Sequence, residues 1–209
     1  MKSILTTLGL VASLISLTPT AEAEEMQEAA IRSHPSQGKV THIINAKARL
    51  MADGNGVFTN METTGLLPGH IYTMWMVVIN DPAACPALPC TPKDVLKRSD
   101  AVQSDVGFAG GAIANAKGEI RLSFYKAKGP FLKPFFSHGL KETSGIEIHL
   151  ILNEHGPVIS GREFEMLNTY RGGCTDKSIP KAMPDTARAM GEPGPYQCRM
   201  VQFAQFLPT

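Results

Sequence analysis

The chain has 209 residues, of which 43% are hydrophobic and 19% are charged, with 20 Lys and Arg against 19 Asp and Glu. This length and apolar content predict one folded domain with a substantial core, and they argue against long intrinsic disorder. The net charge of +1 lacks the basic excess that is typical of nucleic-acid-binding proteins, so we expect no nucleic-acid partner.

Residues 1–23 have the features of a secretory signal peptide. Lys2 supplies a positive charge, an apolar stretch diluted by Ser and Thr follows, and Ala21-Glu22-Ala23 matches a small-x-small cleavage pattern. A retained membrane anchor needs about 20 strongly apolar residues, and this stretch is shorter and more polar. We therefore expect an exported protein, periplasmic or extracellular, with no membrane span after signal cleavage.

The mature chain is expected to consist of an N-terminal arm over residues 24–38 and a single β-sandwich domain over residues 39–209. The arm is rich in acidic residues and resembles a short helix or a mobile segment. From residue 40 to residue 50, apolar and polar residues alternate with period two, which predicts a half-buried strand. A strong turn signal at 53–56 then predicts a hairpin with a return strand over 57–64.

Further β-rich segments follow along the chain. Residues 70–80 are continuously apolar, which predicts a strand buried on both faces. Alternating or β-rich segments recur at 102–115, 120–125 and 145–153, and the chain ends on a strand or short helix at 198–206. With no repeated helical pattern between them, these elements predict an all-β, antiparallel β-sandwich of about seven to eight strands.

Four cysteines are expected to staple this fold: Cys85, Cys90, Cys174 and Cys198. An even number of cysteines in an exported chain favours disulfides. We predict the pairs Cys85–Cys90 and Cys174–Cys198, because each closes a local loop rich in Pro and Gly. A zinc site of four thiolates is the alternative, but the second pair is too widely spaced for one.

The residues with the clearest chemical potential lie in and near the segment 145–159. On a strand, Glu147 and His149 point to the same face, about 6.6 Å apart. His155 has the same parity, but it lies about 20 Å from His149 unless the chain turns before it. With His70 from a neighbouring strand, these residues could bind Zn²⁺ or Cu²⁺. Hydrogen-bonded structural histidines, or a role in acid–base catalysis, are the alternatives.

Two further features bear on function. The aromatic residues Phe131, Phe135 and Phe136 lie in a Pro-interrupted loop, and they form either an exposed contact surface or a lid over one end of the sandwich. No nucleophile elbow, phosphate-binding loop, dinucleotide fingerprint or zinc-protease motif occurs. The sequence therefore offers no evident catalytic machinery.

Three stretches of the chain together carry a resemblance to a known family: GLLPGHIYTMWMVVINDPAAC, GGAIANAKGEIRLSF, and GIEIHLILNEHGPVI followed by GGC and YQCRMVQFAQF. They resemble an uncharacterised family of exported prokaryotic β-sandwich proteins with paired cysteines. The L-x-PG turn and the I-H-x(5)-HGPV pattern are also similar to CHRD-type domains, in which Glu147 would be a histidine. The resemblance covers about residues 40–206 and implies an Ig-like or CHRD-like sandwich, without implying an activity.

Two functions are consistent with these features. The first is a secreted or periplasmic module that binds a protein or small-molecule partner through its loops. The second is an extracytoplasmic metalloprotein with a mononuclear Zn or Cu site made by His149, Glu147 and either His70 or His155.

Overall fold

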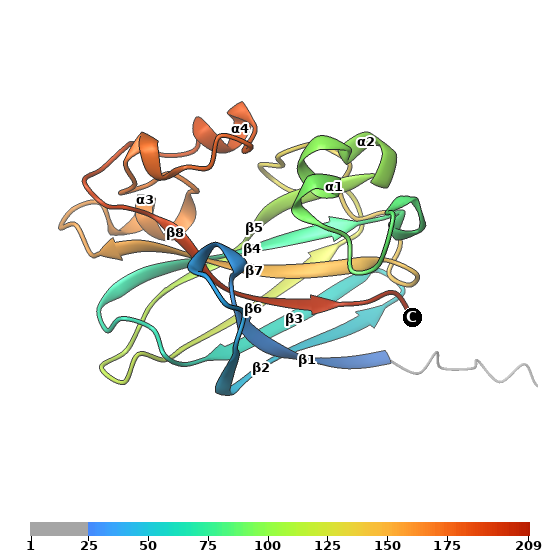
Figure 1. Ribbon diagram of the computed structural model, residues 1–209, viewed down its shortest axis with the longest axis horizontal. Helices are drawn as coiled ribbons and strands as arrows, with labels where there is room; N and C mark the ends of the chain where they lie inside the picture. The colour runs from blue at the N-terminus through green and yellow to red at the C-terminus, as the bar shows by residue number, and fades with distance from the viewer. Residues whose placement is uncertain (1–24) are drawn as a thin grey trace, which may run out of the picture.

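The computed structural model describes residues 25–209, so the predicted signal peptide lies outside the described residues. Over this range eight strands form one antiparallel sheet in the order β5-β4-β7-β8-β1-β2-β3-β6 (Figure 1). The strands are β1 (Glu25–Ser33), β2 (His42–Asp53), β3 (Gly56–Thr63), β4 (His70–Ile79), β5 (Ser104–Ile113), β6 (Ile120–Ala127), β7 (Glu147–Pro157) and β8 (Arg199–Phe206). The predicted all-β antiparallel fold is confirmed.

The sheet curls until its two edge strands, β5 and β6, contact each other. It is therefore a single, nearly closed sheet, sandwich-like or barrel-like, around a main core. The predicted hairpin at residues 53–56 is present between β2 and β3. There the Asp53 carboxylate accepts hydrogen bonds from the backbone N–H groups of Asn55 (2.7 Å) and Gly56 (2.8 Å).

The prediction of a helix or mobile arm for residues 24–38 is wrong. Residues 25–33 form β1, which pairs with β2 along most of its length and with β8 at Arg32 and Ser33. Only the short 3₁₀ helix η1 (Pro35–Gln37) is helical in this segment. Tertiary pairing thus overrides the local preference of an Ala- and Glu-rich sequence, as is common for strands.

Strand β4 is buried on both faces, as predicted. Its side chains at Met74, Met76 and Val78 belong to the main core inside the curled sheet. Those at Trp75, Val77 and Ile79 belong to a second core on the outer face of β4 and β7. This second core exists because long connections cover the outer face, which would otherwise expose an apolar surface to water.

The covering connections carry all the α-helices of the described residues, and in Figure 1 these helices lie on one side of the sheet. The first connection contains η2 (Pro82–Ala84), α1 (Pro92–Lys97) and α2 (Ser99–Val102). The second contains α3 (Glu163–Asn168), η3 (Asp176–Ser178) and α4 (Asp185–Arg188). No helix within residues 25–209 is long and apolar enough to cross a membrane.

Both predicted disulfides are present. Cys85–Cys90 closes the loop before α1, and Cys174–Cys198 links the loop after α3 to the residue preceding β8. Each disulfide therefore restrains one of the two segments that cover the outer face of the sheet. In this way the pair of disulfides positions the walls of the site described next.

Candidate functional site

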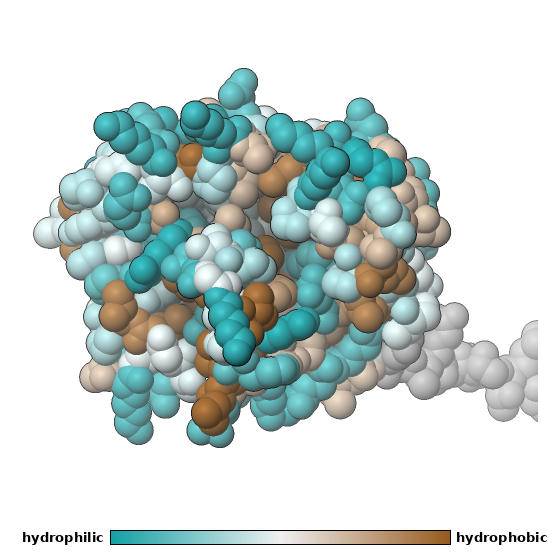
Figure 2. All heavy atoms as spheres, in the orientation of Figure 1, coloured by the Kyte–Doolittle hydropathy of each residue, from teal (hydrophilic) through white to brown (hydrophobic). Residues whose placement is uncertain are grey.

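An apolar cavity of about 270 Å³ lies on the outer face of β4 and β7, between the two covering segments. Its floor is formed by Trp75 and Val77 of β4 and by Ile151 of β7. Figure 2 shows this face of the molecule hollowed between the two helical segments, with hydrophobic residues inside the hollow. The remaining apolar lining consists of Pro92, Val95, Leu96, Val106, Phe135, Tyr170, Pro180, Ala182, Met183 and Met200.

The floor of the cavity follows from the register of β4 and β7, which pairs Trp75 with Ile151 and Val77 with His149. The Trp75 indole packs against the rings of Tyr170 at 5.1 Å and Phe135 at 5.3 Å between centroids. These aromatic contacts join one strand to two distant loops. Such aromatic pairs add stability beyond the area that they bury. Trp75 is also the single tryptophan of the chain.

Helix α1 forms one wall, and its N-terminus is capped by a reciprocal pair of residues. The Thr91 side chain accepts from the Asp94 backbone N–H, while the Asp94 carboxylate accepts from the Thr91 backbone N–H at 3.0 Å. Hydrogen bonds from Thr91, together with the nearby Arg98 guanidinium at 2.7 Å, hold the pKa of Asp94 below its ordinary value. This capping box fixes Val95 and Leu96 of α1 against the cavity.

His149 lines the cavity and pairs with Glu147, which is not itself a lining residue. Glu147 is fully buried, and His149, 7% exposed, donates a hydrogen bond from Nε2 to its carboxylate. The Cys90 backbone N–H donates to the two oxygens of the same carboxylate, at 2.9 and 3.2 Å. The same His149 Nε2 atom lies 3.3 Å from the Gln205 side-chain amide nitrogen. The pair therefore links β7 to the Cys85–Cys90 loop and places one imidazole face at the cavity.

His70 does not join this pair. It lies at the opposite end of β4, where its Nδ1 contacts the Glu154 carboxylate at 2.7 Å. The same carboxylate accepts from Arg199 at 2.7 Å, so the three residues form a closed charge network on β4, β7 and β8. The interaction partner of His70 is therefore Glu154 and not the Glu147–His149 pair.

His155 is also separate from the Glu147–His149 pair, and it is buried completely. Its Nδ1 donates to the Gly172 carbonyl at 2.8 Å, and its Nε2 lies 2.7 Å from the Thr73 hydroxyl. The Thr73 hydroxyl in turn accepts from the Trp75 indole N–H at 2.9 Å. Burial lowers the pKa of His155 to about 4. A neutral His155 therefore connects the strands to the covering loop through one continuous chain of hydrogen bonds.

This burial predicts a specific pH dependence of stability. Below about pH 6.5 the unfolded chain protonates His155, whereas the folded protein resists protonation until about pH 4. The contribution of neutral His155 to the free energy of unfolding is complete above about pH 6.5, and it is lost as the pH falls toward 4. Between pH 7.5 and 4.5, wild type should lose about 2–3 kcal/mol more unfolding free energy than His155→Gln, measured by urea denaturation. Parallel losses in the two proteins would contradict this role for His155.

The structure does not assemble the predicted metal-ligand set. Strand β7 stays extended through Pro157, so His149 and His155 remain about 20 Å apart along the strand. Within residues 25–209, the single group that places three ligand atoms within 4.8 Å of one another is His155, Cys174 and Cys198. These two cysteines are joined in a disulfide. Metal binding by the Glu147–His149 pair remains a prediction.

The structure does not present Phe131, Phe135 and Phe136 as an exposed contact surface. Phe131 and Phe135 are buried, and Phe136 is half-buried. Phe131 packs in the main core, where its ring lies 4.9 Å from the Lys126 ammonium and over Gly107. Phe135 enters the second core and lines the cavity. This loop therefore acts as a cover, because the second core offers an apolar surface for the rings of Phe135 and Phe136.

Tyr170 and Asn153 are cavity residues that sequence reasoning missed. Tyr170 is 5% exposed, and burial raises the pKa of its hydroxyl, with Arg188 opposing this effect, so the hydroxyl stays protonated. Within residues 25–209 that hydroxyl has no hydrogen-bond partner. Asn153 shares the parity of Glu147 and His149 on β7, and this alternation is the one sequence signal that could have identified it.

No protein-family model matches this chain, no curated protein matches it in sequence, and no solved structure matches it.

Proposed function

We propose that this protein is an extracytoplasmic binding protein whose cavity above β4 and β7 takes up a small, mostly apolar molecule. The observation that carries the proposal is the cavity itself, which combines an apolar lining with a few polar groups from His149, Asn153 and Tyr170. Small-molecule sites in proteins are mostly apolar concavities in which a few polar groups fix the orientation of the ligand.

The construction of the cavity supports this proposal. Its volume of about 270 Å³ lies close to the lower end of the range of about 300–1,000 Å³ that is typical of ligand sites. Its walls come from two segments that are each restrained by a disulfide, and a preformed site avoids the entropic cost of ordering loops on binding. Two disulfides are also compatible with an extracytoplasmic location.

Energy transfer from Trp75 to a bound apolar fluorophore tests the proposal directly. N-phenyl-1-naphthylamine absorbs where tryptophan emits, and Trp75 is the single tryptophan and lines the cavity. We expect saturable energy transfer to this probe in the wild-type protein. Ala182 is exposed at the edge of the cavity, so Ala182→Trp should obstruct the site and weaken binding at least tenfold.

The matched control is Ala189→Trp, which places the same ring at another exposed alanine that does not line this cavity. Because each variant adds a second tryptophan, binding is compared through the dissociation constant from probe emission rather than through transfer efficiency. The absence of saturable binding in wild type, or equal binding by the two variants, would refute the proposed site.

A metal-binding function is the second candidate, and the adjacency of the Glu147 carboxylate and the His149 imidazole favours it. These two residues offer donor types that suit Zn²⁺ or Cu²⁺, and solvent or a bound molecule would complete the coordination. Metal analysis by mass spectrometry of the untagged mature protein, beside His149→Ala, tests this candidate. Stoichiometric Zn or Cu that disappears in the variant would support it, and metal-free protein that takes up neither ion would exclude it.

A further inference from the structure

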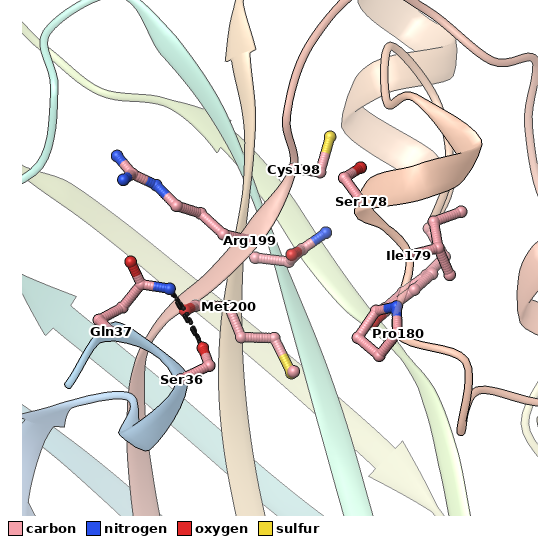
Figure 3. Close-up of a pocket in the computed structure, with 10 residues that line it drawn as sticks. Ser36, Gln37, Ser178, Ile179, Pro180, Cys198, Arg199 and Met200 are labelled. Atoms are coloured by element: carbon pink, nitrogen blue, oxygen red, sulfur yellow. Dashed lines mark hydrogen bonds between the residues drawn. The ribbon is translucent and has the colours of Figure 1, made fainter.

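A second cavity of about 200 Å³ adjoins the first one. The two share four lining residues, namely Asn153, Tyr170, Pro180 and Met200. Figure 3 shows the second cavity between η1 and the start of β8 on one side and the loop around η3 on the other. Its lining is more polar than that of the first cavity and includes Ser36, Gln37 and Ser178.

The polar side chains of the second cavity are oriented by hydrogen bonds to one another and to backbone carbonyls. The Gln37 amide donates to Ser36 Oγ at 3.1 Å and to the Met200 carbonyl at 2.9 Å (Figure 3). The Ser178 hydroxyl donates to the Thr175 carbonyl at 2.7 Å. Ser36 Oγ is an acceptor in one of these bonds, whereas the Gln37 carbonyl oxygen and the lone pairs of the Ser178 hydroxyl are used by none of them and stay available as acceptors.

No unpaired charge lines either cavity within the described residues. Arg199 is the one lining residue with a permanent charge, and it pairs with Glu154 at 2.7 Å, its side chain pointing away from Ile179 and Pro180 in Figure 3. In the first cavity His149 pairs with Glu147, and burial lowers the pKa of His34. A charged ligand would therefore lose its hydration without gaining a counter-charge, which is costly in a buried site.

Tyr170 lines both cavities. Its ring is held by Trp75 and Phe135, at 5.1 and 5.5 Å between centroids, so its position is fixed by the second core. Among residues 25–209 the buried side-chain atoms that lack a hydrogen-bond partner are Arg32 Nε and Thr175 Oγ1, so the Tyr170 hydroxyl is not a buried unsatisfied group. A hydroxyl can donate one hydrogen bond and accept others, so a ligand with a polar group can bond to it. The residue therefore has a polar atom that is prepared for a bound molecule.

We propose that the ligand is a neutral amphiphile that lies across both cavities. Its apolar body occupies the first cavity above Val77, and its uncharged polar end, a hydroxyl or an amide, bonds to the Tyr170 hydroxyl and faces Ser36 and Gln37. This inference rests on the proposed function and deepens it by naming the class of ligand. The two cavities together reach the volume range of typical ligand sites, whereas neither does so alone.

A matched series of phenylbutyl compounds tests this class through displacement of N-phenyl-1-naphthylamine. The series has one skeleton with four different ends: butylbenzene, 4-phenyl-1-butanol, 4-phenylbutanoate and 4-phenylbutylammonium. We expect the alcohol to displace the probe best, and the anion and the cation to bind at least tenfold more weakly than the alcohol.

Tyr170→Phe removes the hydroxyl and keeps the ring. It should weaken 4-phenyl-1-butanol about three- to tenfold, as expected for one neutral hydrogen bond, while butylbenzene binds as before. Tyr125→Phe is the control, because Tyr125 is exposed on β6 and bonds to Asp53 outside both cavities. This control should change neither affinity.

The outcomes separate the two proposals. If the probe does not bind to wild type, the proposed function fails. If the probe and butylbenzene bind but a charged compound equals the alcohol, or if Tyr170→Phe leaves the alcohol's affinity unchanged, binding stands and the neutral-amphiphile inference is overturned.

Discussion

Glu147→Ala is expected to lower the free energy of unfolding by about 3–5 kcal/mol. The Glu147 carboxylate is fully buried and accepts hydrogen bonds from His149 and from the Cys90 backbone N–H. Its removal leaves two buried donors without an acceptor, and each unsatisfied group carries a desolvation penalty. Urea denaturation of the oxidised protein measures the change.

Two controls distinguish this effect from a general effect of losing an acidic residue. Glu147→Gln retains a carbonyl oxygen as an acceptor, so it should cost less than half as much as Glu147→Ala. Glu142→Ala removes an exposed carboxylate that pairs with Lys128, and it should change stability by at most about 1 kcal/mol. If Glu147→Ala destabilised the protein no more than Glu142→Ala, Glu147 would not be the anchor between β7 and the Cys85–Cys90 loop.

Removal of the Cys174–Cys198 disulfide is expected to have the second large effect. In the double variant Cys174→Ala/Cys198→Ala, we expect a loss of about 3–4 kcal/mol, because this bond closes a loop between residues 24 apart in sequence. Alanine is chosen since it places no new polar group in a buried site. Urea denaturation without reductant gives the comparison with wild type.

The matched control is Cys85→Ala/Cys90→Ala, which opens a loop between residues only 5 apart. Chain entropy predicts a smaller loss of about 2 kcal/mol for this variant, since the entropic gain from a cross-link grows with the loop it closes. A loss larger than that of Cys174→Ala/Cys198→Ala would mean that the short disulfide stabilises the protein mainly by positioning the Cys90 backbone N–H against Glu147 rather than through loop closure.

Local signals explain which parts of the fold could be predicted. The hairpin at 53–56 follows from turn chemistry, and β4 follows from a continuous apolar run with both faces buried. Strand β1 could not be predicted, because residues 25–33 combine Glu and Ala without clear alternation. Its extended conformation comes from pairing with β2 and β8, which no local pattern encodes.

The candidate site likewise has features that the sequence predicts and features that it does not. The parity of Glu147 and His149 follows from the period of a strand, so their shared face could be predicted. The cavity could not, because its walls come from loops whose path depends on the whole chain, and Tyr170 lies in such a loop between α3 and η3. The sequence also could not show that His70 lies beside Glu154 rather than with Glu147 and His149, since the register of β4 against β7 is set by tertiary contacts.

A crystal structure of the mature, oxidised protein soaked or grown with 4-phenyl-1-butanol tests the central claim most directly. We predict that the phenyl ring lies above Val77 and Ile151, with the alcohol oxygen within about 2.7–2.8 Å of the Tyr170 hydroxyl. Electron density for the compound elsewhere on the molecule, or a cavity without it at a concentration that displaces the fluorescent probe, would contradict the account.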